Sequence, residues 1–201
     1  MKVATDWEGH YQSGKTGWDR GETSPALQEW LEKGTLEPCE ILVPGCGHGH
    51  EVVELARRGF AVTAIDIAAS PVLSLRNQLE DQGLTAKIIQ ADLLDWKPPR
   101  RFEAIYEQTC ICALEPQDWS VYEKKLQQWL TPKGTLFALF MQTSKEGGPP
   151  YHCDVTEMRR LFSSGWKWPD GSGSKVPHPS GLEELAFVLR HENTPSDQVF
   201  A

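Results

Sequence analysis

Apolar runs alternate with amphipathic segments along most of the chain. Short runs at residues 40–43, 61–65, 86–90 and 102–106 predict strands, and an almost wholly apolar run at 135–141 predicts a strand buried on both faces. Apolar residues at helical spacing predict helices at 24–33, 49–58, 70–82, 117–130 and 154–162. This alternation predicts an α/β fold with a doubly wound, mostly parallel seven-stranded sheet and helices on both faces.

Residues that cap or break helices predict where several helices begin and end. Ser24 is the predicted N-cap of its helix, with Pro25 in the first turn. Pro132 and Gly134 are expected to stop the helix before the central strand. The segments around Asp170 and at 185–190 predict two antiparallel strands at the C-terminal edge of the sheet. We expect a single domain over residues 1–201, of which residues 1–23 form a polar N-terminal arm.

Charge and composition narrow the choice of partners. The formal net charge is -8, and lysines and arginines are scattered, so we expect no nucleic-acid partner. No apolar run approaches the roughly 20 residues that a membrane span needs, so we expect no membrane partner. Five cysteines and a polar N-terminus without signal-peptide character indicate reduced thiols in the cytoplasm. A monomer is the expected state.

A glycine-rich turn follows the first strand. Glycines 45, 47 and 49 alternate there, and the second apolar run ends on Asp66. Such a unit holds an adenosine-containing ligand, with backbone N–H groups facing the ligand and the acid taking the ribose hydroxyls. A dinucleotide loop has G-x-G-x-x-G, but His50 stands at the third glycine position. The pattern fits better a loop that cradles the amino-acid end of S-adenosylmethionine; a ligand-free turn is the alternative.

Four motifs carry a family resemblance. They are Gly17-Trp18-Asp19-Arg20-Gly21 with Thr23-Ser24-Pro25-Ala26-Leu27, Leu42-Val43-Pro44-Gly45-Cys46-Gly47, Asp66-Ile67-Ala68, and Gly147-Gly148-Pro149-Pro150-Tyr151, with weaker support from Cys112-Ala113-Leu114-Glu115-Pro116. The chain resembles the class I S-adenosylmethionine-dependent methyltransferases, specifically the thiopurine S-methyltransferase family with its thiol and halide methyltransferase relatives. The resemblance implies the Rossmann-like methyltransferase fold and S-adenosyl-L-methionine as cofactor, with S-adenosyl-L-homocysteine as product.

The resemblance also assigns cofactor positions residue by residue. It implies that the methionine end of the cofactor contacts the glycine loop and that an acid binds the ribose hydroxyls. It also implies that a second acid accepts from the adenine amino group, and that the end of the fourth strand lies near the sulfonium. The implied residues are Gly45, Gly47, Asp66, Ile67, Asp92, Leu93, Glu107 and Gln108. Glu107 is expected either to bind the cofactor's ammonium group or to face water. Relatives carry other residues at the Gln108 position.

Three aromatic residues match the arm that closes over the cofactor in relatives. They are Trp7, Tyr11 and Trp18, and relatives usually have tryptophan at the middle position. Aromatic faces attract a cation by on the order of 0.5–2 kcal/mol each, so the rings suit a sulfonium. The alternative is that they only fix the arm to the core.

The expected reaction is transfer of the methyl group to a small-molecule acceptor, a soft nucleophile such as a thiol, thiopurine, hydrosulfide or halide. Such acceptors arrive ionised or nearly so, and therefore need no dedicated base. Residues 108–114 are mostly small or apolar and fit a dry pocket. Tyr151 is the candidate catalytic residue, because its hydroxyl can orient or help deprotonate a thiol; a rigid turn with a packed ring is the alternative.

Other functions remain open at this point. An NAD-dependent oxidoreductase shares the glycine loop and Asp66, and a non-catalytic binding module on the same fold predicts cofactor binding without transfer. Cys46, His48 and His50 alternate, but their spacing is not typical of zinc sites, so we expect no metal and place both histidines near solvent. A disulfide between Cys110 and Cys112 is disfavoured by their spacing. Replacing Asp66 by alanine is expected to weaken cofactor binding and leave the fold intact.

Overall fold

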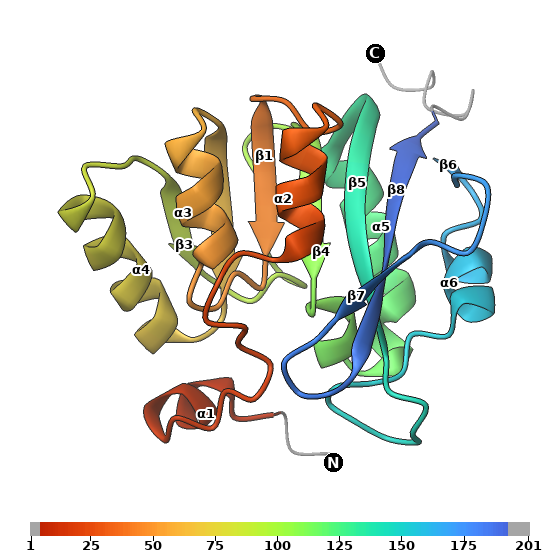
Figure 1. Cartoon of the computed structure of the whole chain (residues 1–201), viewed down its shortest axis with the longest axis horizontal. Helices are drawn as coiled ribbons and strands as arrows, with labels where there is room; N and C mark the ends of the chain where they lie inside the picture. The colour runs from red at the N-terminus through yellow and green to blue at the C-terminus, as the bar shows by residue number, and fades with distance from the viewer. Residues whose placement is uncertain (1–4, 193–201) are drawn as a thin grey trace. The chain divides into compact units, whose positions relative to one another are not determined.

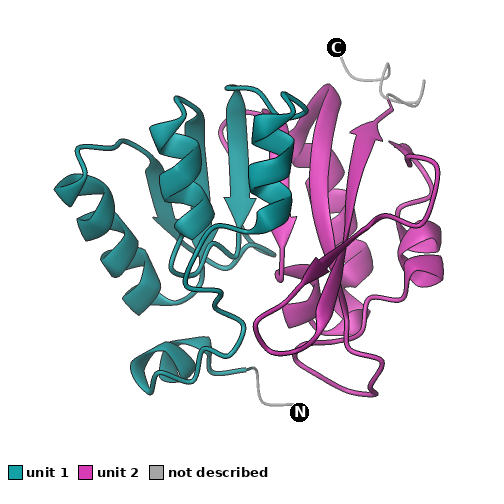
Figure 2. Cartoon of the chain, viewed as in Figure 1, with its two compact units in different colours: residues 1–96 teal, residues 97–201 magenta. Residues whose placement is uncertain are grey.

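The computed structural model describes residues 5–192. Its contacts divide the chain into two compact units, residues 1–96 and 97–201, which are coloured separately in Figure 2. The expectation of a single domain stays a prediction.

The first unit is built on a parallel three-stranded arrangement, in the order β3-β2-β1 (Figure 1). Its elements are α1 (Trp7–Gln12), α2 (Pro25–Glu32), β1 (Glu40–Pro44), α3 (His50–Arg57), β2 (Ala61–Asp66), α4 (Ala69–Asp81) and β3 (Lys87–Gln90). Val43 pairs with Ala64, and Ile65 pairs with Ile89, so the carboxyl ends of the strands meet at one edge. These ends carry the glycine loop and Asp66.

Helices cover the strands of this unit with their apolar sides. Helix α3 contacts β2 and buries Val52, Val53 and Leu55, while α4 contacts β2 and β3. The arm helix α1 buries none of its residues and packs on α4. Ser24 precedes α2 as predicted, but its side chain makes no capping bond; its N–H donates to Glu51 at the start of α3.

The second unit contains the remaining strands. Its elements are β4 (Phe102–Gln108), η1 (Ile111–Ala113), η2 (Pro116–Asp118), α5 (Trp119–Trp129), β5 (Leu130–Gln142), α6 (Val155–Leu161), β6 (Trp166–Lys167), β7 (Ser174–Pro177) and β8 (Glu183–His191). Strand β5 is parallel to β4 and antiparallel to β8, and β6 and β7 both pair antiparallel with β8. The antiparallel C-terminal edge is confirmed, with three strands rather than the two expected. The described residues therefore form eight strands, so the predicted number of seven is wrong.

The start of β5 differs from the prediction. The helix ends at Trp129, and β5 already begins at Leu130, so Pro132 and Gly134 lie inside the strand. The backbone accommodates them by an irregularity: Lys133 has φ 69, and the register with β4 shifts between Phe102 and Ala104. Breaker residues in a bulge leave a strand continuous on either side of them.

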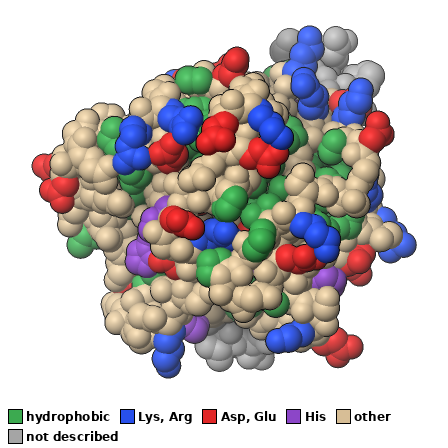
Figure 3. All heavy atoms as spheres, in the orientation of Figure 1, with side chains coloured by type: hydrophobic (Ala, Val, Ile, Leu, Met, Phe, Trp, Pro, Cys, Tyr) green, Lys and Arg blue, Asp and Glu red, His purple; other side chains and the backbone are tan. Residues whose placement is uncertain are grey.

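Charge is mixed over the visible surface. Figure 3 shows lysine and arginine side chains interspersed with aspartate and glutamate on the face that it draws. Within residues 5–192, no helix is both long and apolar enough to cross a bilayer.

Candidate functional site

The glycine loop between β1 and α3 has a conformation that needs glycine. Gly47 has φ 50 and Gly49 has φ 74, which is the left-handed region. A Cβ on Gly47 would lie 2.8 Å from the hydroxyl of Tyr11, and one on Gly49 would lie 2.5 Å from the side chain of Leu75. The loop therefore brings its backbone close to the arm on one side and to α4 on the other.

Asp66 lies at the carboxyl end of β2, beside this loop. Its Oδ2 accepts from the N–H of Gly47 at 2.8 Å, and its Oδ1 accepts from the N–H of Ala68 at 2.9 Å. The residue is 7% exposed, and burial raises the pKa of the carboxyl while these hydrogen bonds lower it. Through these two bonds the carboxylate also holds the glycine loop to β2. The expectation that an alanine variant keeps the fold stays a prediction.

An exposed apolar side chain and a second acid lie close to Asp66 along the chain and the sheet. Ile67 is 49% exposed although it is apolar. The N–H of Ala91 donates to the carbonyl of Asp66, which ties the end of β3 to the end of β2. The next residue, Asp92, is exposed, and its Oδ1 accepts from the N–H of Leu94 at 2.8 Å. Leu93, between them, is half-buried.

The three aromatic residues of the arm come together. Trp18 lies edge-on to Trp7 at 5.4 Å between ring centroids and edge-on to Tyr11 at 5.7 Å. Tyr11 also packs edge-on against His48 of the glycine loop at 5.2 Å. Burial and the nearby Asp66 raise the pKa of Tyr11. The arm thus lies against the loop through a cluster of rings.

A second contact fixes the arm helix. The carboxylate of Glu8 accepts from the N–H of Ser70 at 3.0 Å and bonds the Ser70 hydroxyl, at the N-terminal end of α4. These bonds lower the pKa of Glu8. A carboxylate is favoured at this position, because the N–H groups of a first helical turn have no partner within the helix.

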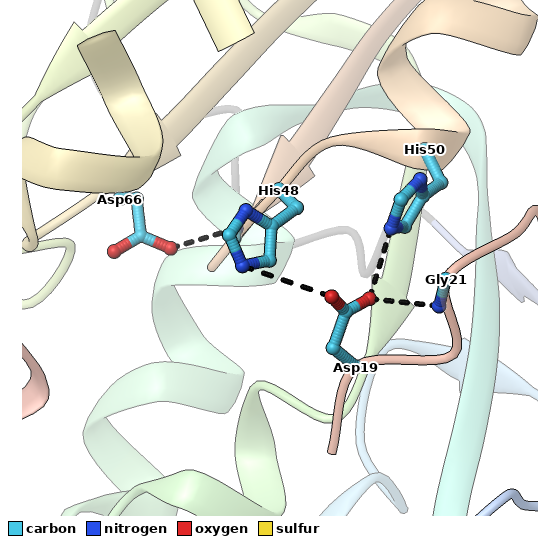
Figure 4. A network of polar contacts seen from close by, with 6 residues as sticks. Asp19, Gly21, His48, His50 and Asp66 are labelled. Atoms are coloured by element: carbon cyan, nitrogen blue, oxygen red, sulfur yellow. Dashed lines mark hydrogen bonds and ion pairs between the residues drawn. The ribbon is translucent and has the colours of Figure 1, made fainter. Parts of the chain in front are cut away.

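The two histidines of the loop lie at the start of α3 with partly exposed side chains, as expected, and both also contact Asp19 of the arm. His50 Nε2 lies 2.9 Å from Asp19 Oδ1, and His48 Nε2 lies 3.7 Å from Asp19 Oδ2 (Figure 4). Their side chains are partly exposed, at 26% and 35%. In the described part of the chain, no group of three or more His, Cys, Asp or Glu residues is placed to hold a metal ion.

In the second unit, Glu107 near the end of β4 is 1% exposed, so the alternative that it faces water is wrong. Its Oε1 accepts from the N–H of Ile111 at 2.6 Å, whereas its buried Oε2 has no hydrogen-bond partner among residues 5–192. Burial raises the pKa of this carboxyl to about 8, opposed by the bond from Ile111 and supported by the nearby Glu184. Near neutral pH the group is therefore largely uncharged.

Gln108, the last residue of β4, is held between two side chains. Its Oε1 accepts from the Tyr106 hydroxyl at 2.7 Å, and its Nε2 donates to Glu184 Oε2 at 2.9 Å. Glu184 lies on β8 and is fully buried. Sequence reasoning missed it; the available signal was a carboxylate within an otherwise apolar strand, which needs a partner.

Tyr151 is brought to the turn that follows β4. Its N–H donates to the carbonyl of Cys112 in η1 at 2.7 Å, and its side chain is half-buried. Trp119 Nε1 donates to the carbonyl of Ile111 at 2.9 Å, which fixes the same turn from α5. Burial raises the pKa of the Cys112 and Cys153 thiols, so both stay neutral. The catalytic role of the Tyr151 hydroxyl stays a prediction.

Comparison with known proteins adds an independent line of evidence. Residues 2–182 match the family model described as Thiopurine S-methyltransferase (TPMT). The chain is 32% identical over 156 residues to Thiocyanate methyltransferase 1 of Brassica oleracea, covering 75% of this chain and 68% of that one. It is 27% identical over 179 residues to the Thiopurine S-methyltransferase of Pseudomonas fluorescens (strain Pf0-1), covering 80% of this chain and 82% of that one.

The fold also matches solved structures. A Burkholderia thailandensis 1,6-didemethyltoxoflavin-N1-methyltransferase, crystallised with its acceptor and S-adenosylhomocysteine, aligns with a TM-score of 0.75 and 18% identity over 94% of this chain and 86% of that one. This likeness confirms the predicted α/β, Rossmann-like methyltransferase fold.

Proposed function

This chain belongs to the thiopurine S-methyltransferase family, and from that premise we propose that it transfers a methyl group from S-adenosylmethionine to the sulfur of a small soft nucleophile. The family match spans residues 2–182 and carries the proposal. It disfavours the NAD-dependent oxidoreductase. A non-catalytic module on the same fold is the outcome that an activity test has to exclude.

The first unit offers the groups that an adenosine ligand requires. Asp66 carries a carboxylate with lone pairs left for ribose hydroxyls after its two backbone bonds. Ile67 presents an exposed apolar side chain for the adenine face, and Asp92 an exposed carboxylate for the adenine amino group. Gly45 and Gly47 lack a Cβ where the backbone is to approach the methionine end. We assign the adenosine part of the cofactor to these residues.

The second unit offers a buried acceptor for an amine. The orphaned Oε2 of Glu107 is the kind of atom that demands a donor, because an unpartnered buried oxygen is costly. We assign this oxygen to the ammonium group of the cofactor, with Gln108 positioned beside it by Tyr106 and Glu184. When bound, S-adenosylmethionine supplies a methyl group on a positively charged sulfur.

The rings of the arm suit this charge. Trp7, Tyr11 and Trp18 form one cluster against the glycine loop, where their faces can stabilise a cation by on the order of 0.5–2 kcal/mol each. We therefore infer that residues 1–23 act as a lid that excludes water and shields the sulfonium. Water exclusion favours the transfer, since the charges of an anionic nucleophile and a cationic donor are dispersed in the transition state.

The acceptor side favours a nucleophile that needs little help from a base. The turn after β4 buries Cys110, Ile111 and Cys112, whose side chains are neutral and therefore do not repel an anion. Tyr151 is our candidate for orienting a thiol through its hydroxyl. Because the match to a thiocyanate methyltransferase is closer than that to a thiopurine methyltransferase, we favour a thiocyanate-like anion or small thiol.

The test is a panel of acceptors in which release of S-adenosylhomocysteine is measured. Thiocyanate, hydrosulfide, small thiols, iodide and a thiopurine form the test set, and amines and carboxylates are the controls. We expect turnover with at least one sulfur nucleophile and none with the controls. Turnover confined to amines or carboxylates would overturn the proposed acceptor class, and binding of the cofactor without turnover on any acceptor would favour the non-catalytic module.

The remaining expectations concern the state of the protein in the cell. We propose a monomer that works in a reducing cytoplasm, supported by the five cysteines and by the scattered charges. Light scattering coupled to size-exclusion chromatography tests the monomer directly, since a dimer elutes with twice the chain mass.

A further inference from the structure

Asp19 of the arm is shared between two histidines of the glycine loop. Its Oδ1 lies 2.9 Å from His50 Nε2 and also accepts from the N–H of Gly21 at 2.9 Å, while its Oδ2 lies 3.7 Å from His48 Nε2. Figure 4 shows both rings turned toward this one carboxylate. The contact joins segments that are 31 residues apart along the chain. It is therefore a tertiary contact between arm and loop.

His48 also lies next to Asp66, the acid that we assign to the ribose. In Figure 4 its ring lies between Asp19 on one side and Asp66 on the other. Burial raises the pKa of Asp66, and the charge interaction with His48 is the smallest of the effects that oppose this rise. Asp66 is thus connected to the arm through one imidazole and one carboxylate.

The same histidine holds the aromatic cluster. Tyr11 packs edge-on against His48 and against Trp18, and Trp18 is the chain neighbour of Asp19. Moving Asp19 away from the loop therefore moves Trp18 as well. The charged contact and the ring contacts thus hold neighbouring residues of the arm against the same loop.

The contact between Asp19 and the two histidines is partly exposed to solvent. The side chains of Asp19, His48 and His50 are 24%, 35% and 26% exposed, and they border a groove that Asn77 and Asp81 of α4 also line. Partly exposed ion pairs contribute modestly and are reversible. Glu51, the chain neighbour of His50, accepts from the N–H of Ser24 and thereby fixes the chain after the arm.

We propose that Asp19, His48 and His50 form a latch that holds the arm closed over the ribose-binding acid. This inference rests on the proposed function, because it takes Asp66 as the acid that receives the ribose. Closure of the arm and binding of the ribose then reinforce each other, because His48 lies between Asp19 of the arm and Asp66. Such coupling between two binding events is reciprocal. The three residues are positioning residues, which act on the cofactor through the arm.

The test measures the affinity and dissociation rate of S-adenosylhomocysteine for Asp19→Asn, His50→Ala and the double variant. Asp19→Asn keeps an oxygen for the Gly21 N–H and removes only the charge. We expect each single variant to bind about tenfold more weakly, mainly through faster dissociation, and the double variant to be no weaker than the singles. The KM for the cofactor rises while kcat stays within about twofold. Glu22→Gln, an exposed acid three residues away, is the control and should match the wild type.

The outcomes separate the latch from the proposed function. A wild-type chain that does not bind S-adenosylhomocysteine contradicts the proposed function. A wild type that binds, together with latch variants of unchanged affinity, contradicts the latch alone. Effects that add in the double variant also contradict it, because the residues then act independently. Thermal unfolding of each variant detects a folding defect, and His48→Ala replaces a variant that fails to fold.

Discussion

At the scale of single residues, the carboxylate of Asp66 has a structural contact that its sequence position does not predict. Asp66 is predicted from the sequence as a ligand-binding acid because it ends a strand after a glycine loop. Its hold on that loop through Gly47 and Ala68 depends on backbone geometry that no sequence pattern encodes. Under the proposed function, one side chain therefore serves both cofactor binding and the stability of the loop.

The dual role of Asp66 gives a prediction for its alanine variant. Asp66→Ala removes a charged acceptor from two backbone N–H groups, and we expect it to lower the free energy of unfolding by about 2–4 kcal/mol. We also expect binding of S-adenosylhomocysteine to fall by more than tenfold. Chemical denaturation and calorimetric titration measure the two effects. Asp92→Asn serves as the comparison, because that exposed acid should lose affinity with little loss of stability. Unchanged affinity in Asp66→Ala would show that another group binds the ribose.

The buried Glu107 predicts how stability depends on pH. Its pKa is about 8 in the folded chain, against 4.5 as the reference value, so the unfolded chain binds fewer protons within this window. Stability therefore falls as pH rises from 4.5 to 8, with a contribution of roughly 1.4 kcal/mol per pH unit. Glu107→Gln should remove this contribution and leave the shallower slope of the other buried acids. An identical slope in variant and wild type, measured by denaturation in the absence of cofactor, would contradict the assignment.

Some site residues were predictable and others were not. Trp7, Tyr11 and Trp18 follow from the family motif, and the structure brings them together. Glu184 lies 76 residues from its partner Gln108, so local patterns do not join them. The pairing of Asp19 with His50 was missed for the same reason, because each residue alone looks like a polar surface group.

At the scale of elements, periodicity predicted the strands and helices, and tertiary contacts decided where they end. Helix α4 and strand β2 lie within one residue of their predicted bounds. Strand β5 begins earlier than expected, because residues that break an isolated strand are accommodated in a bulge beside β4. The proposed function gives the arm a role of its own, as a lid.

Deleting the arm tests its role as a lid. Removal of residues 1–20 takes away the aromatic cluster, the Glu8 contact to α4 and Asp19. We expect cofactor affinity and methyl-transfer activity to fall together by more than tenfold, because shielding and binding depend on the same rings. Titration calorimetry and the acceptor assay measure both quantities, with circular dichroism as a check of folding. Undiminished turnover by the truncated chain would contradict the lid.

At the scale of the whole molecule, the family and the fold converge on one chemistry. The fold alone hosts transfer to many kinds of acceptor, as the N1-methyltransferase of similar structure illustrates. The family match and the features of the two units restrict that range toward soft nucleophiles. The formal net charge is -8, and charges of both signs are interspersed on the face that Figure 3 draws. We therefore assign the choice of acceptor to the residues of the proposed site rather than to a charged surface.

The most direct measurement follows the methyl group itself. Purified protein is incubated with S-adenosylmethionine carrying a deuterated methyl group and with thiocyanate or a small thiol, and the products are identified by mass spectrometry. We expect transfer of the deuterated methyl group to the sulfur of the acceptor, together with one S-adenosylhomocysteine for each product molecule. Label that stays on the cofactor with every sulfur nucleophile, or that appears only on nitrogen or oxygen, would contradict it.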